Sequence, residues 1–544
     1  MSRLITTLIV FGSLALLVAP AAAELTVHPR KRTETSPGSG RYHATTSTAA
    51  WQAPETAIIV CDMWDSHHCL NAVRRVGELV PRMNQVLETA RKQGTLIIHA
   101  PSSCMEAYAD HPARANAKLA PTAANLPSDI GQWCRHIPAE DAGQYPVDQK
   151  DGGEDDEPAE HAAWAALLES KGLNPRAPWK RQVDGLRIDP KFDIISDSGV
   201  EIWNTLEQRG IKNVVLLGVH TNMCVLGRPF GLRQMAKNGK NVVLMRDMTD
   251  TMYDPSKWPY VSHFSGTDRI VEHIEKFVCP TITSVDILGG KEFRFSRDRR
   301  PHLVLLVAED EYKTEVSLPP YVTRHLERDF RVTTVFGNDV ERNDLPGIDA
   351  VANADLLLVS VRRRTIPVKQ LEYVRKHVAA GKPLLGIRTA NHAFAPSKGK
   401  QPGEGQDAWN NWDPEVFGGS YRGHHPEGPK PKLAVADQAS SHPILAHVDF
   451  KDWLGHGSLY QVNPLLPGTV PLISGTIGGQ PTETIAWVRI RADGGRSFYT
   501  SLGHVDDFQT ASFRRLLFNA IYWSAGLPIP EHMADSPEKF VAGK

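Results

Sequence analysis

Unbroken runs of apolar residues, rather than alternating apolar and polar positions, mark most of the strands that the sequence predicts. Such a run is typical of a parallel strand that is covered on both faces. In the second half the runs alternate with helical segments such as residues 368–380, which predicts a doubly wound parallel sheet. We therefore predict an α/β protein with two doubly wound, three-layer domains, each built on a mostly parallel sheet. The predicted strands occupy residues 57–61, 95–99, 214–217, 303–308, 332–336, 356–361 and 384–387.

The length of 544 residues also predicts two domains, because one hydrophobic core rarely serves a chain this long. The polar, arginine-rich stretch at 291–301 is the natural place for a linker between them. The predicted divisions are a signal peptide at 1–23, a flexible lead-in at 24–51, a first domain at 52–285, a linker at 286–300, a second domain at 301–527 and a tail at 528–544.

The first residues predict export. Arg3 precedes an apolar run at 4–18, and Ala21, Ala22 and Ala23 then provide a small-residue cleavage pattern. The run is shorter than the roughly 20 residues that a membrane-spanning helix needs. The sequence therefore predicts a secretory signal peptide and a mature chain that is periplasmic or secreted, with no membrane insertion.

Composition narrows the class of partner. The net charge is -1 and the pI is about 7.1, so the chain lacks the basic surface that nucleic-acid binding requires. Its apolar content of 41% and charged content of 23% are ordinary for a globular enzyme. The sequence favours a small-molecule substrate and no nucleic acid.

Two polar residues follow the first-domain strands at what should be the carboxyl edge of the sheet, where open α/β folds place their sites. Asp62 follows the run at 57–61, and Cys224 lies in the turn after 214–217. A helix predicted at 229–239 begins just beyond the cysteine, and a helix N-terminus lowers the pKa of a thiol. The alternative is that Cys224 is a small core residue, as most free cysteines are.

Residues 218–225 read Gly-Val-His-Thr-Asn-Met-Cys-Val and carry a resemblance. They look like the signature of the isochorismatase-like cysteine hydrolases, and the resemblance extends over about 52–285. It implies that Cys224 is the nucleophile and that Asp62 is the base. It also implies a lysine near both, which keeps the Asp62 carboxylate ionised and stabilises the Cys224 thiolate. It also implies a cis peptide at Val219–His220, which lets backbone amides near Cys224 form an oxyanion hole.

The same resemblance leaves the lysine open between two positions. Counting back from Gly210 without gaps selects Lys191, whereas a longer loop would select Lys180. Family members often assemble, so a homo-oligomer is expected. The implied reaction is cleavage of a C–N bond other than a peptide bond in a small molecule, with no cofactor required.

The chain departs from the family near Asp62. Trp64 stands where the family usually has glutamine, and the Asp-x-His metal element of nicotinamidases is absent, which argues against nicotinamide as the substrate. Imidazole and carboxylate ligands suit zinc, so histidines in this region could bind a divalent metal. The alternative is that they only form hydrogen bonds in the substrate pocket or at its rim. The histidines concerned are His67, His68 and His99.

Two other features of the first half carry open alternatives. The acidic run at 152–157 is solvated surface or a lid over the pocket, with Asp155 and Asp156 as further metal-ligand candidates. Of the six cysteines, Cys69 and Cys104 are the disulfide pair to test in an oxidising compartment.

The second half resembles the trehalose-utilisation (ThuA-like) branch of the class I glutamine-amidotransferase-like fold over about 300–527. The matching segments are 441–444, 485–487, 501–504 and 513–523. Glutamine amidotransferases place a cysteine in the turn after the strand at 384–387, but this chain has Arg388 there and no cysteine beyond Cys279. Glutaminase chemistry by that nucleophile is thus excluded. Residues that could line a sugar-binding pocket, or else be structural, are Arg388, His392, His442, His504, Trp409 and Trp412.

The sequence as a whole predicts an exported cysteine hydrolase with an accessory second domain that is related to carbohydrate. Two alternatives stay open. One is a non-enzymatic protein that binds a small ligand or a sugar, and the other is an enzyme whose main activity lies in the ThuA-like domain.

Overall fold

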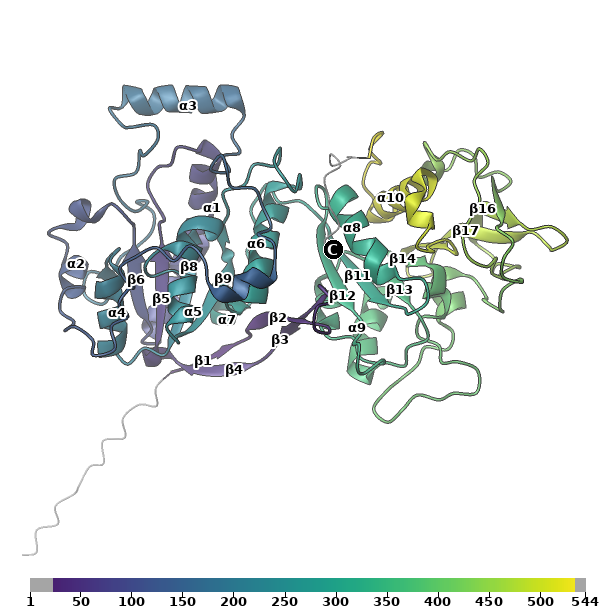
Figure 1. The fold of residues 1–544 in the computed structure, drawn as a ribbon, viewed down its shortest axis with the longest axis horizontal. Coiled ribbons are helices and arrows are strands. Elements are labelled where there is room, and N and C mark those ends of the chain that lie inside the picture. The colour runs from purple at the N-terminus through teal and green to yellow at the C-terminus, as the bar shows by residue number, and fades with distance from the viewer. Residues whose placement is uncertain (1–22, 534–544) are drawn as a thin grey trace, which may run out of the picture.

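Two eight-stranded sheets organise residues 23–533, the part of the chain that this computed structural model describes (Figure 1). Both sheets are mostly parallel and both carry helices on their two faces, so the predicted α/β class with two three-layer domains is confirmed. The predicted signal peptide lies outside the described residues, apart from Ala23, as does the end of the predicted tail. Among residues 23–533, no helix is both long and apolar enough to cross a membrane.

The first sheet has the strand order β3-β2-β10-β9-β8-β5-β6-β7. The six strands from β10 to β7 are parallel, and β2 and β3 extend the sheet antiparallel at one edge. Its strands are β2 (Arg30–Glu34), β3 (Tyr42–Thr46), β5 (Thr56–Cys61), β6 (Leu96–Ala100), β7 (Ile194–Ile195), β8 (Asn213–Val219), β9 (Asn241–Asp250) and β10 (Thr281–Ile282).

Alternate residues of each central strand enter two different cores. In β5, Ile58 and Val60 pack with helix α1 (Leu70–Lys92) and α7 (Val285–Leu288), while Ile59 faces the opposite core. That second core is built with α4 (Gly199–Gln208), α5 (Leu232–Lys237) and α6 (His263–Phe277). Burial on both faces is why these strands are continuously apolar in sequence.

The flexible lead-in predicted for residues 24–51 is wrong, because those residues form strands. β1 (Glu24–Val27) pairs with β4 (Ala49–Gln52) in a two-stranded sheet, and β2 and β3 join the edge of the main sheet. Polar residues conceal these strands in the sequence. In β2 the guanidinium of Arg30 contacts the buried carboxylate of Glu275 at 2.8 Å, so ion pairing replaces the usual apolar packing.

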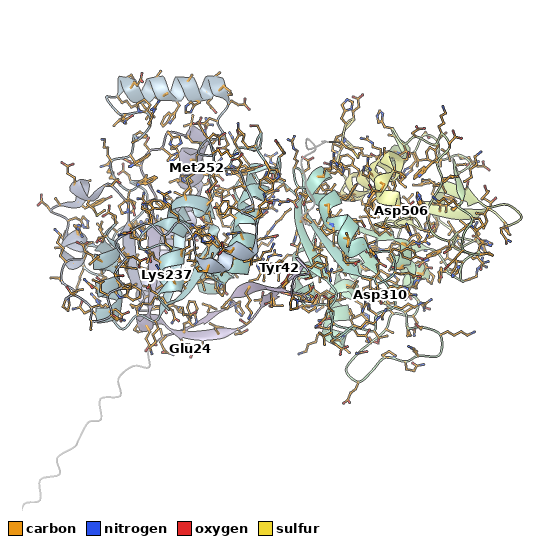
Figure 2. All side chains as sticks on the ribbon, in the orientation of Figure 1. Glu24, Tyr42, Lys237, Met252, Asp310 and Asp506 are labelled. Atoms are coloured by element: carbon orange, nitrogen blue, oxygen red, sulfur yellow. The ribbon has the colours of Figure 1, made fainter. Side chains whose placement is uncertain are left out.

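The β2–β3 arm reaches the second domain (Figure 1). Figure 2 shows Tyr42, at the start of β3, between the two domains. Beside it the guanidinium of Arg41 contacts the carboxylate of Asp339 at 3.1 Å. Farther along, Gly347 has a positive φ of 87°, and a Cβ there would lie 2.4 Å from the carbonyl oxygen of Ala44. The arm and the second domain therefore fit closely together.

The second sheet has the order β12-β11-β13-β14-β18-β17-β16-β15. The first five strands are parallel, and the last three continue the sheet antiparallel. One face packs against α8 (Thr314–His325) and α10 (Ala511–Ala525), and the other against α9 (Val368–Ala379). Its strands are β11 (His302–Ala308), β12 (Arg331–Phe336), β13 (Leu356–Val361), β14 (Leu384–Ile387), β15 (Lys432–Val435), β16 (Thr469–Thr476), β17 (Glu483–Ile490) and β18 (Arg496–Thr500).

A long excursion between β6 and β7 contributes to the site described below. It contains two short α-helices, α2 (Pro112–Asn116) and α3 (Pro158–Ser170), joined by extended segments. Helix α3 stands away from the body of the first domain (Figure 1), and among its residues only Leu168 is buried.

Candidate active site

The carboxyl ends of β5, β6 and β8 bring the two predicted chemical groups together. Asp62 follows β5, Ser102 follows β6, and Cys224 lies in η4 (Thr221–Val225), a single π-type turn after β8. The peptide between Val219 and His220 is cis, as the resemblance implied. Gly218, just before it, has a φ of 103°, and a Cβ there would lie 2.1 Å from the carbonyl oxygen of Cys61, so this position requires glycine.

Asp62 is fully buried and is held by three contacts. The amide of Ser102 donates to Oδ1 at 2.8 Å, and Nε of Arg228 donates to Oδ2 at 3.0 Å. The third is with the side chain of Cys224, which lowers the pKa of Asp62. Burial raises the pKa of Asp62, and these contacts oppose the rise. Its φ of 45° is unusual for a residue with a side chain, and such backbone conformations cluster at functional sites.

The pKa of Cys224 is raised, which differs from the expectation of a thiol made acidic by a helix N-terminus. The residue is only 7% exposed, and its pKa is raised first by burial and then by the negative charge of Asp62. The positive charge of Arg228 opposes both effects. The thiol therefore holds its proton more firmly than an exposed cysteine does, and any reaction must move that proton.

The structure does not bring either predicted lysine to this pair. Lys191 is exposed, with its ammonium 5.0 Å from the ring centre of Phe192, and it lies before β7, at the edge of the sheet. Lys180 is also exposed, and its amide donates to Asp65. The cation beside Asp62 is Arg228, four residues after Cys224, which the sequence prediction missed. Its position in the segment after the cysteine was the available clue.

We expect Arg228→Met to slow the reaction of Cys224 with iodoacetamide at pH 8 by at least about tenfold. Loss of a positive charge within about 4–6 Å raises the pKa of an acidic group by one unit or more. The measurement is the alkylation rate of the Cys224 peptide by mass spectrometry. Arg228→Lys should recover part of the rate because it restores the charge. Equal rates in all three proteins would show that Arg228 has no electrostatic effect on the thiol.

Aromatic rings surround this centre. The indole of Trp64 donates to the carbonyl of Ser102 at 3.1 Å and stacks on Trp179 at 4.5 Å between ring centres. The guanidinium of Arg228 lies 4.7 Å from the ring centre of Trp133. Trp64 is therefore placed beside the candidate catalytic residues, in the region where the sequence predicted a substrate pocket.

The predicted pocket histidines divide into two groups. His67 is buried against Trp179 and lies 4.8 Å, between ring centres, from His220. The ring of His68 lies 4.0 Å from that of His67, between ring centres, and is tilted against it. Burial lowers the pKa of all three rings, that of His220 to about 4, so they are neutral at physiological pH.

His99 belongs to a different environment, and its assignment to the pocket is corrected. Its side chain is fully buried, with Nδ1 2.9 Å from Gln182 and Nε2 3.2 Å from the carboxylate of Asp193. Asp193 is also paired with Arg91 at 2.7 Å. Because both ring nitrogens have protein partners, His99 holds the long excursion in place and offers no free atom to a substrate or metal.

The acidic run is not simply solvated surface. Asp156 is buried and accepts hydrogen bonds from the amides of Leu70 and Asn71, at the N-terminus of α1, both at 2.7 Å. Asp155 is paired with Arg75 of α1 at 2.8 Å. Carboxylates at this position satisfy amides that the helix leaves free. The acidic run therefore attaches the segment between β6 and β7, which includes α3, to helix α1.

Within residues 23–533, two groups of side chains have a spacing that a metal ion could use. They are Cys69 with Asp155 and Asp156, and Glu154 with Asp156 and His161. Neither group includes His67, His68 or His99. All six cysteines are free, so the predicted pairing of Cys69 with Cys104 is wrong.

The residues predicted to line a pocket in the second domain lie in different places. Arg388 and His392 lie in η6 (Arg388–His392) after β14, and His504 follows β18, so all three lie at the carboxyl edge of the second sheet. His442 instead begins η8 (Pro443–Leu445), where its Nδ1 accepts from the amide of Ile444. Trp412 is fully buried and Trp409 bonds to Glu415, so the predicted stacking surface is not formed by Trp412.

Comparison with known proteins finds likenesses to both halves. The ThuA family, described as trehalose utilisation, matches residues 304–524. No curated protein matches the chain.

Three of the solved structures that resemble the chain each match less than half of it. A protein described as ThuA-like from Parabacteroides merdae is 16% identical, with 44% of this chain and 96% of the other covered, at a TM-score of 0.32. A cysteine hydrolase from Pseudomonas syringae is 17% identical, with 44% and 92% covered, at a TM-score of 0.27. An N-carbamoylsarcosine amidase from Thermoplasma acidophilum is 12% identical, with 42% and 96% covered, at 0.22. Over residues 304–524, the chain is thus similar to the ThuA family.

Proposed function

We propose that residues 52–285 form a cysteine hydrolase that cleaves a C–N bond in a small amide. The observation that carries this proposal is the contact between the Cys224 thiol and the buried Asp62 carboxylate, next to a cis peptide and a charged Arg228. A thiol and a base in hydrogen-bond contact are the arrangement that nucleophilic catalysis needs.

The proposed reaction begins with proton transfer. As Sγ of Cys224 attacks the carbonyl carbon of the amide, the thiol proton passes to Asp62. Asp62 then gives this proton to the leaving amine, the C–N bond breaks, and a thioester remains on Cys224. Water attacks the thioester, giving one proton to Asp62. Release of the carboxylic acid then returns that proton to the sulfur.

Arg228 acts in this scheme through charge. Its guanidinium lies against Asp62 and favours the ionised carboxylate, which is the form that can accept the thiol proton. The positive charge also stabilises the thiolate as it forms. The arginine therefore takes the part that the resemblance assigned to a lysine.

The surroundings favour a small substrate with an unsaturated or apolar group. Cys224 is 7% exposed and belongs to the same buried cluster as Trp64, whose ring stacks on Trp179. The neighbouring imidazoles of His67 and His220 are neutral, so they offer hydrogen bonds without a positive charge.

The test uses 4-nitrophenyl acetate, an activated ester that acylates reactive thiols. We expect a burst of one 4-nitrophenolate per chain and one acetyl group on the Cys224 peptide, seen by mass spectrometry after acid quenching. Cys279 is the internal control, because it is also 7% exposed and its pKa is likewise raised by burial. Acetylation of both peptides at similar rates would contradict the proposal.

We further propose that the mature protein is exported and begins at Glu24. β1 begins at this residue, immediately after the predicted cleavage site, and all six free cysteines are buried, which limits their oxidation outside the cytoplasm. N-terminal sequencing of protein from the periplasmic fraction should give Glu-Leu-Thr. A retained residue 1–23 segment would contradict export by cleavage.

A further inference from the structure

The segment 222–228 carries both the candidate nucleophile, Cys224, and the cation beside Asp62, Arg228. Residues 133–149, which belong to the excursion between β6 and β7, lie against this segment at several points. Their contacts are with the backbone of the segment and with the side chain of Arg228. The chemistry proposed above assigns no part to them.

The turn that contains the nucleophile, η4, is held by β9 and by the residues that follow β9. The hydroxyl of Thr221 lies 2.7 Å from that of Thr249 and donates to the carbonyl of Asp250 at 2.8 Å. The side-chain amide of Asn222 donates to the carbonyl of Met252 at 2.8 Å and accepts from its amide at 3.0 Å. The side chains of the turn are therefore tied to the sheet.

The excursion holds the backbone of the same turn. The hydroxyl of Tyr145 and Nε2 of Gln149 both donate to the carbonyl oxygen of Asn222, each at 3.0 Å. This carbonyl lies two residues before Cys224. Because it accepts two side-chain hydrogen bonds, the peptide cannot rotate without losing both of them. The two bonds therefore set the direction in which the chain continues to Cys224.

A third side chain of the excursion lies against Arg228. The guanidinium is 4.7 Å from the ring centre of Trp133, a distance at which a cation is attracted to the face of an aromatic ring. A Cβ on Gly227 would lie 2.8 Å from the same ring, so Trp133 packs directly on the backbone before Arg228. The amide of Cys134 also donates to the carbonyl of Gly227 at 2.9 Å. Trp133 therefore limits where the guanidinium can go.

We propose that Tyr145, Gln149 and Trp133 are positioning residues for the candidate active site. Tyr145 and Gln149 fix the turn that places Sγ of Cys224, and Trp133 keeps the guanidinium of Arg228 against Asp62. This inference rests on the proposed function, in which Cys224 is the nucleophile. A displacement of about 1 Å in a reacting atom can slow a reaction by about 10²-fold, so contacts of this kind affect the rate without touching the substrate.

The first test is the burst of 4-nitrophenolate from 4-nitrophenyl acetate. Replacing Tyr145 with phenylalanine and Gln149 with leucine together should lower the rate constant of the burst at least about tenfold, because Sγ is less well placed. The amplitude should stay at one per chain, since chains that fail to fold would lower the amplitude and not the rate. Tyr321→Phe is the matched control, because its hydroxyl donates to the carbonyl of Arg514 at the same 3.0 Å in the second domain.

Tyr145→Phe alone decides the matter if the double variant has a reduced amplitude, because it removes a single hydroxyl. Its burst should also be slower than that of the parent at full amplitude. A burst rate equal to that of the parent, in folded variants, overturns the assignment of Tyr145 and Gln149.

The second test is the rate at which iodoacetamide alkylates Cys224 at pH 8. The charged groups that act on this thiol are Asp62, which raises its pKa, and Arg228, which lowers it. Trp133→Leu frees the guanidinium to move away, so alkylation should become at least about threefold slower, as a rise of half a pKa unit gives. Unfolding would expose the thiol and speed the reaction, so a slower rate cannot come from lost structure.

Trp133→Phe should keep most of the parent rate because it retains a ring beside Arg228. Phe192→Leu is the matched control, because this ring is also exposed and lies 5.0 Å from the cation of Lys191. Alkylation requires no turnover, so a parent that gives no burst would refute the hydrolase and leave the alkylation rates to decide the role of Trp133. An equal or faster rate in Trp133→Leu overturns that role.

Discussion

Replacing Cys224 with alanine is expected to lower the steady-state hydrolysis of 4-nitrophenyl acetate by about 10³-fold or more. The physical reason is that the other thiol next to Asp62, that of Cys61, is fully buried, and burial holds its pKa well above the usual value. When catalytic residues act as a unit, removing the nucleophile alone loses nearly all of the rate enhancement that the unit provides. The measurement is initial rate against substrate concentration, for variant and parent at equal folded concentration.

The matched control is Cys279→Ala. Cys279 lies between α6 and β10, has the same 7% exposure as Cys224, and has no hydrogen bond to a carboxylate. Its loss should leave the rate within about twofold of the parent, since no catalytic group is affected. If Cys224→Ala kept most of the activity, hydrolysis would have to come from the second domain or from surface groups.

The fold was largely predictable because burial on both faces leaves a strong pattern. Strands such as β8 and β11 are continuously apolar and were located within one or two residues. The strands at 24–51 were missed for the opposite reason. β2 reads Arg-Lys-Arg-Thr-Glu, and its place in the sheet depends on Glu275, which lies some 245 residues away in sequence. Pairing between such distant charges leaves no local pattern.

The candidate site was predictable where chemistry follows a strand end, and not where it depends on loop conformation. Asp62 and Cys224 come directly after β5 and β8, so sheet topology alone brings them together. The cation was misassigned because the lysine was placed by counting residues back from Gly210. The conformation of the long segment between β6 and β7 does not follow from such a count. Arg228 contacts Asp62 from the segment that follows η4. The turn of η4 determines the direction in which that segment leaves β8.

Asp62→Asn is the second substitution expected to have a large effect, with a loss of about 10²- to 10⁴-fold in kcat/KM for 4-nitrophenyl acetate, the range that a general base contributes. An asparagine side chain keeps the shape of Asp62 and can accept the amide of Ser102, but it cannot take the thiol proton. The pH profile distinguishes this loss from a structural one.

In the parent protein Asp62 must be ionised, and burial raises its pKa above the ordinary value for aspartate. Activity should therefore fall as pH decreases through that raised pKa, at a higher pH than an exposed aspartate would give. The acid limb should be missing from Asp62→Asn, whose residual rate should instead rise with pH as Cys224 ionises without help. An unchanged acid limb in the variant would assign the titration to another group and remove Asp62 from the proton transfer.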